Sequence, residues 1–185
     1  MSICKSLLFG CEGNYNFFGA EVSFKKSEFE WYRFEAGFSG RAANFLLNSK
    51  CFRLLTMGYL HAFVHEMGHS LAAKILQGEW SSIEIQTDTC IGRNIGNGRY
   101  LSRLGSTICY LSGPLADVVF SMSKIFLAFT LSPYITLPVA AGIACGSAIW
   151  IFGEFFYAAH SVWQNDSGDF ARIARNGPLH LAASS

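Results

Sequence analysis

The stretch that decides the fold is residues 54–76, LLTMGYLHAFVHEMGHSLAAKIL, which contains no proline. As an α-helix it would be about 34 Å long, close to the thickness of the hydrocarbon core of a bilayer. Gly78 follows it, and glycine is typical of a helix end. The segment therefore predicts a membrane-spanning helix, and this helix would carry five ionisable residues: His61, His65, Glu66, His69 and Lys74.

Two further apolar segments follow, residues 106–132 and residues 134–163, and together with the first they predict three membrane spans. Their few charged residues are Asp117, Lys124 and Glu154. The simplest expectation for Lys124 and Glu154 is a salt bridge between spans. The alternative to three spans is three buried helices of a soluble bundle, but segments this long exceed ordinary core helices.

Composition agrees with a membrane protein. Of 185 residues, 51% are hydrophobic and only 15% are charged, against about 25% in a typical soluble domain. The net charge of +1 provides no field for phosphates, which argues against a nucleic-acid partner. The six cysteines form no CxxC pair and do not require an oxidising compartment.

Outside the apolar segments, alternating apolar and polar residues predict short β-strands at 20–25, 29–34 and 83–86. The glycine-rich stretch after residue 90 is predicted to be a loop. The expected fold is an all-α membrane core of about three transmembrane helices, with short strands near the membrane surface. The chain is accordingly divided into a small aqueous or interfacial N-terminal segment, the core and a polar tail: residues 1–50, 51–177 and 178–185.

The chemistry is concentrated in His65-Glu66-Met67-Gly68-His69, an H-E-x-x-H motif. Two histidines four residues apart lie on one face of a helix and can reach one zinc ion, while Glu66 can take a proton from water. The alternative is a purely structural polar cluster, which is costly within an apolar span. His61 is expected to pack or to hydrogen-bond rather than to bind metal. A catalytic site needs a third ligand, and the candidates are Asp117, Glu154, His160, Asp166 and Asp169.

The motif and the residues after it resemble the first motif of the site-2 protease family of intramembrane zinc metalloproteases. Ser112-Gly113-Pro114-Leu115-Ala116-Asp117 resembles the family's G-P-x-x-N element, with Asp117 in place of the usual asparagine. The third motif, D-G-x-R-[IL], is only loosely matched by Asn165-Asp166-Ser167-Gly168-Asp169-Phe170-Ala171-Arg172-Ile173. This layout favours Asp169 as the third ligand, with Asp166 as the alternative.

The resemblance implies an integral, multi-pass membrane protein that holds Zn²⁺ with His65, His69 and Asp169 and uses Glu66 as general base. Gly113 and Pro114 would border the substrate, and Asp117 would hydrogen-bond substrate or a ligating histidine, or pair with Lys124. The partners would be the bilayer and a membrane-embedded or membrane-proximal protein or peptide substrate, and the oligomeric state stays open. Two alternatives are an inactive metal-binding membrane module of the same fold and an ion transporter.

Overall fold

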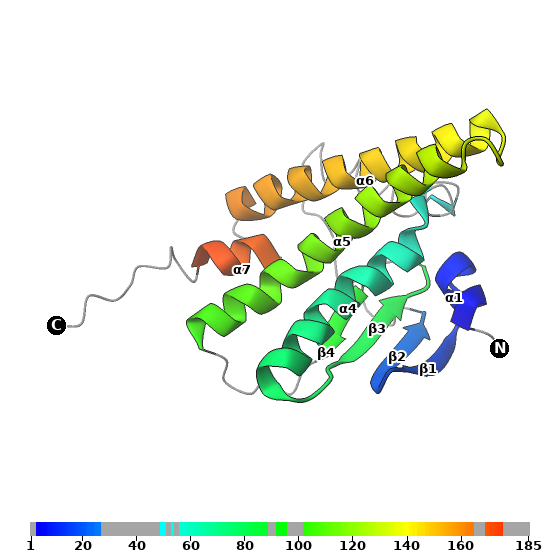
Figure 1. Cartoon of the computed structure of the whole chain (residues 1–185). Coiled ribbons are helices and arrows are strands. Elements are labelled where there is room, and N and C mark those ends of the chain that lie inside the picture. Colours follow the sequence, from blue (N-terminus) through cyan, green and yellow to red (C-terminus); the bar gives the residue numbers. More distant parts are fainter. Residues whose placement is uncertain are drawn as a thin grey trace.

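The computed structural model describes residues 3–26, 49–50, 53, 56–88, 92–95, 102–164 and 169–175. The chain is arranged in layers, with a sheet on one side, α4 against it, then α5, and α6 outermost (Figure 1). The elements in order are α1 (Ile3–Phe9), β1 (Gly13–Phe17), β2 (Ala20–Lys25), α4 (Gly58–Gln77), β3 (Ser82–Gln86), β4 (Gly92–Ile95), α5 (Arg103–Leu131), α6 (Leu137–Gln164) and α7 (Asp169–Arg175).

The sheet has four strands in the order β1-β2-β3-β4. β1 and β2 form an antiparallel hairpin, and β3 and β4 are also antiparallel, whereas β2 and β3 run parallel. Parallel neighbours need a crossover connection, and α4 lies within that connection. The predicted strands at 20–25 and 83–86 are confirmed, but β1 was not foreseen. The glycine-rich stretch predicted as a loop contains β4, and the predicted strand at 29–34 lies outside the described residues.

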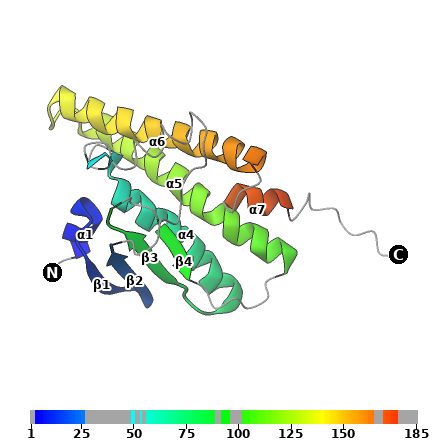
Figure 2. The same cartoon turned by 180° about the vertical axis from the view of Figure 1, so that it is seen from behind.

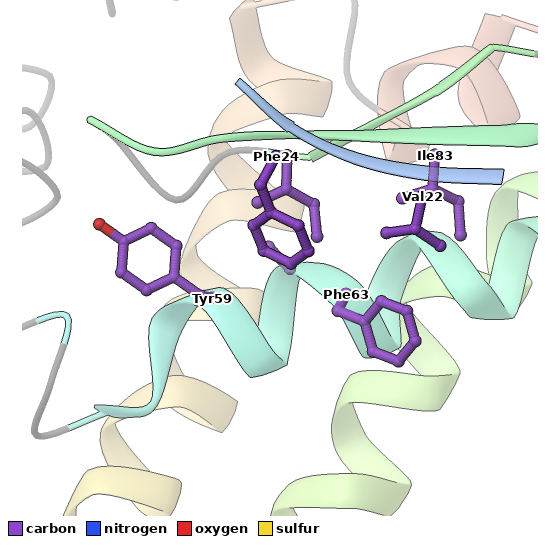
Figure 3. Packing of buried hydrophobic residues seen from close by; sticks show 7 residues of the cluster. Val22, Phe24, Tyr59, Phe63 and Ile83 are labelled. Atoms are coloured by element: carbon purple, nitrogen blue, oxygen red, sulfur yellow. The ribbon is translucent and has the colours of Figure 1, made fainter. Parts of the chain in front are cut away.

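The apolar core lies between the sheet and one face of α4. Val22 and Phe24 of β2 and Ile83 of β3 are each about 1% exposed, and they pack on Tyr59 and Phe63 of α4 (Figure 3). Alternate residues of a strand point to one face, which explains the alternation of buried and less buried residues along β2. This packing fixes the rotation of α4, so that its opposite face is directed at α5.

α4 is shorter at its start than the predicted span. Met57 has a left-handed backbone (φ 54°), and the regular helix begins only at Gly58. At the other end Gly78 has φ 79°, and its N–H bonds to the carbonyl of Lys74. Glycine adopts this conformation without strain, which is why it ends the helix here.

α5 and α6 form a long helical hairpin that extends beyond the sheet (Figure 1). Among the described residues, 104–131 and 137–156 are long and apolar enough to cross a membrane. Both helices expose large apolar side chains, including Phe126, Phe129, Phe152 and Phe155. α4 is not among these candidate spans, because it carries the polar residues of the motif and is covered by the sheet on one face. The expectation of a third span is therefore not confirmed.

The short helix α7 follows α6 and packs against both α5 and α6 (Figure 2). Ala171 of α7 is 1% exposed. The guanidinium of Arg172 lies 5.4 Å from the centre of the Tyr110 ring of α5, in a cation–π contact. These contacts hold the first residue of α7, Asp169, over the middle of α4 and α5.

Candidate metal centre

Three side chains from two distant parts of the chain converge on one point. The Nε2 atoms of His65 and His69 lie 3.1 Å apart. One carboxylate oxygen of Asp169, Oδ2, lies 3.2 Å from each of these nitrogens. The expected pair and the preferred third residue are thus brought together, although about 100 residues separate Asp169 from the motif.

The other nitrogen of each imidazole is occupied by a hydrogen bond. His65 Nδ1 donates to Oδ2 of Asp117 over 2.7 Å, and His69 Nδ1 donates to the backbone carbonyl of Cys109 over 2.5 Å. Neither a carboxylate nor a carbonyl can donate, so the ring proton of a neutral imidazole is on Nδ1 in both residues. Both Nε2 atoms therefore direct a lone pair at the point shared with Asp169.

Three electron-pair donors at this separation repel one another unless a cation lies between them. Two imidazoles and one carboxylate match the ligand set of catalytic zinc sites, which leave a fourth position open. Zinc–ligand bonds of about 2.0–2.1 Å in a tetrahedron place neighbouring ligand atoms about 3.3 Å apart, close to the observed separations. The residues present therefore fit a zinc ion.

Asp169 is suited to bind a cation because its carboxyl group is ionised. Its side chain is 19% exposed. Burial by itself raises the pKa of this carboxyl group, but when the imidazoles of His65 and His69 are protonated, their hydrogen bonds and positive charge outweigh burial and hold the pKa well below the usual range. The group is a carboxylate at neutral pH.

Two glycines allow α4 and α5 to approach each other at the centre. A Cβ atom at Gly113 would lie 2.4 Å from Nε2 of His69 and 2.8 Å from Nε2 of His65. A Cβ atom at Gly68, inside the motif, would lie 2.5 Å from the carbonyl oxygen of Ser112. Only glycine fits at either position, and Gly113 lies directly beside the two imidazoles. Pro114 lies within α5, which continues through it.

Glu66 lies on a different side of α4, directed at the sheet. It is 5% exposed, and a Cβ atom at Gly92 of β4 would lie 2.8 Å from its Oε1 atom. The side-chain amide of Asn94, also on β4, donates to the backbone carbonyl of Glu66 over 2.8 Å. β4 is an edge strand that lies beside α4 (Figure 2), and it thus contacts both the backbone and the side chain of Glu66.

Asp117 connects His65 to a second histidine, the buried His61, and through it to Lys124. Its other oxygen, Oδ1, lies 3.4 Å from Nδ1 of His61, and His61 Nε2 lies 2.5 Å from Nζ of Lys124. Asp117 thus bonds a candidate ligand, one of the roles considered for it, whereas Lys124 contacts His61, which lies between Lys124 and Asp117. The expected salt bridge between Lys124 and Glu154 is wrong. Glu154 instead has an oxygen within 4.8 Å of ligand atoms of Asp117 and His65.

The two other candidates for the third ligand whose side chains the structure describes, Asp117 and Glu154, are not in the group formed by His65, His69 and Asp169. Asp117 bonds the far nitrogen of His65, Nδ1, and an oxygen of Glu154 lies within 4.8 Å of ligand atoms of these two residues. Asp166 and the side chain of His160 lie outside the described residues. Sequence reasoning missed the contributions of Cys109, Gly92 and Asn94, and the contact of Lys124 with His61. Cys109 acts through its backbone carbonyl. The other contributions depend on the pairing of β4 and the packing of α5, for which the sequence has no local signal.

The fold and the site together define a metallopeptidase-type protein, in which an H-E-x-x-H helix and a distant acidic residue form a candidate metal centre. The sequence profile of the family described as Peptidase M50B-like matches residues 40–162. The chain belongs to this family, which confirms the resemblance to site-2 proteases and supports a protease-type function. The match includes the H-E-x-x-H motif and Asp117, while Asp169 lies beyond it. Searches of curated proteins and of solved structures found no match to the chain.

Proposed function

We propose that the protein is an intramembrane zinc metallopeptidase that cleaves peptide bonds in membrane-embedded or membrane-proximal substrates. The observation that carries this proposal is the convergence of His65 Nε2, His69 Nε2 and Asp169 Oδ2 within 3.2 Å of one another. These residues would hold Zn²⁺. A zinc ion bound there would lower the pKa of a water molecule toward about 7 and polarise the carbonyl of the scissile bond.

Glu66 is the residue proposed to move protons. Its carboxylate takes a proton from the attacking water and returns it to the nitrogen of the leaving amine. Its contacts with Gly92 and Asn94 hold it in one position relative to the motif, so that proton transfer does not require a search among rotamers. Asp117 and the Cys109 carbonyl keep the two imidazoles oriented.

The surroundings of the centre support a membrane substrate. α5 passes directly beside the imidazoles at Gly113, and within the described part of the chain it is one of two helices long and apolar enough to cross a membrane. β3 is an inner strand of the sheet, paired with β2 and with β4. In the part of the chain that the structure describes, β4 pairs only with β3, which leaves its outer edge open beside Glu66. An extended substrate segment can add to such an edge by main-chain hydrogen bonds.

The test is Glu66→Gln in the full chain purified in detergent and reconstituted into liposomes. We expect the variant to retain zinc but to cleave a panel of single-span membrane peptides at least about 100-fold more slowly than the unmodified protein. Metal analysis and product detection by mass spectrometry measure the two properties. The exposed Glu12→Gln is the matched control and should behave as the unmodified protein. Purified protein without zinc, or equal cleavage by Glu66→Gln, would refute the proposal.

A further inference from the structure

Beside the candidate metal centre, a row of buried polar side chains extends between the packed helices. It consists of Asp117, His61 and Lys124, whose exposures are 1%, 0% and 8%. Lys124 lies seven residues after Asp117 on α5, and therefore on the same face of the helix. A lysine buried on a helix of this apolar character is costly unless it has a partner.

The direction of the hydrogen bonds along this row is determined by Lys124. An ammonium group only donates, so Nε2 of His61, 2.5 Å from it, must be the acceptor. The proton of neutral His61 is therefore on Nδ1, which points at Oδ1 of Asp117. The other oxygen of Asp117, Oδ2, accepts a second hydrogen bond from Nδ1 of His65. The carboxylate of Asp117 thus accepts from both imidazoles, which leaves Nε2 of His65 free to bind metal.

Aromatic rings keep this row in place. The ring of Trp150 stacks on His61, with centroids 4.1 Å apart and planes 19° apart. Phe120 contacts His61 with its edge, and its ring lies 5.0 Å from Nζ of Lys124. His61 is thus clamped in one orientation between α5 and α6.

Lys124 also compensates the negative charge of the buried Asp117 carboxylate. A buried carboxylate is costly unless an opposite charge and hydrogen bonds compensate it. Asp117 is almost completely buried, and a second acidic side chain, Glu154, lies nearby. Lys124 provides a positive charge that reaches Asp117 through one imidazole.

We infer that Lys124 and His61 are positioning residues of the metal centre. They compensate and orient Asp117, which in turn fixes the ring of His65 with Nε2 directed at the metal. This inference rests on the proposed function, because it assumes that His65 is a zinc ligand. It adds two residues, neither of which touches the metal or the substrate.

The test uses Lys124→Met, Asp117→Asn and the double variant in the full chain purified in detergent. Zinc affinity is measured by competition with a chromophoric chelator. The visible absorption of the Co²⁺-substituted protein reports the geometry of the ligands, which a purely structural role would not change. Lys74→Met, which removes an exposed lysine of α4, is the matched control.

Lys124→Met should weaken zinc binding about tenfold and alter the Co²⁺ spectrum, because Asp117 loses its compensating charge. The double variant should bind zinc more tightly than Lys124→Met, since the asparagine side chain that replaces Asp117 is neutral and still accepts from His65. This comparison remains informative if Lys124→Met folds poorly, because the double variant then also regains folded protein.

Lys124→Met with the zinc affinity and Co²⁺ spectrum of the unmodified protein would overturn the inference. The inference would also be overturned if the free energy of zinc binding lost by the double variant were the sum of the free energies lost by the two single variants. In both cases the unmodified protein still binds zinc, so the proposed function stands. Unmodified protein that binds neither zinc nor Co²⁺ would overturn the proposed function together with this inference.

Discussion

Gly113 of α5 lies so close to His69 of α4 that a Cβ atom at position 113 would be 2.4 Å from Nε2 of His69. The nearest atoms are ring atoms of the two histidines, which hydrogen bonds to Asp117 and to the Cys109 carbonyl already hold. Neither ring can move aside without losing its bond. The two imidazoles can therefore occupy these positions only because residue 113 has no side chain.

Gly113→Ala should therefore remove zinc rather than merely slow turnover. The added methyl group pushes the imidazoles apart, and we expect zinc affinity to fall by about 100-fold or more. Zinc content after dialysis against a weak chelator is the measurement. Gly142→Ala on α6 is the matched control, because a Cβ atom there meets nothing within 4 Å. Retention of stoichiometric zinc by Gly113→Ala would contradict the placement of α5.

Asp169→Ala should lower zinc content more than Asp166→Ala. The reason is that Oδ2 of Asp169 lies 3.2 Å from both Nε2 atoms, so its removal leaves only two ligands. Metal analysis of the two variants in parallel makes the comparison, with Asp166→Ala serving as the control for loss of a nearby carboxylate. The reverse order would reassign the third ligand to Asp166.

Gly92→Ala should affect turnover while zinc is retained. A Cβ atom at position 92 would lie 2.4 Å from Cγ of Glu66, so the carboxylate must move. A displacement of about 1 Å can cost about 100-fold in rate, and we expect a loss of that size in peptide cleavage. Gly153→Ala, where the added atom meets nothing within 4 Å, should leave cleavage unchanged. A fully active Gly92→Ala protein would show that this contact does not position Glu66.

Phe24→Ala should destabilise the fold. Phe24 is 1% exposed in the core between the sheet and α4, and truncation of a buried phenylalanine costs about 3–5 kcal/mol. Thermal unfolding in detergent, followed by circular dichroism, measures the loss. Phe18→Ala is the matched control: Phe18 is 81% exposed, and a surface change is worth at most about 0.5 kcal/mol. Equal effects of the two substitutions would contradict the core described here.

The local features of the fold could be predicted from the sequence because they depend on nearby residues. The helices at α4, α5 and α6 follow from long apolar segments, and the strands β2 and β3 follow from alternation. β4 could not be predicted, because Gly92-Arg93-Asn94-Ile95 has little intrinsic strand character and is a strand by virtue of pairing with β3. The start of α4 was also missed, since the left-handed backbone at Met57 has no signal in its side chain.

The sequence by itself determined the pairing of the two imidazoles, because residues four apart on a helix share a face wherever that helix is placed. The tertiary structure decided which acidic residue joins them, because the docking of α7 on α5 and α6 brings Asp169 to the imidazoles. It also decided that Lys124 contacts His61 rather than Glu154. Such contacts depend on the rotation and separation of packed helices, and these are set by the combined packing of many side chains.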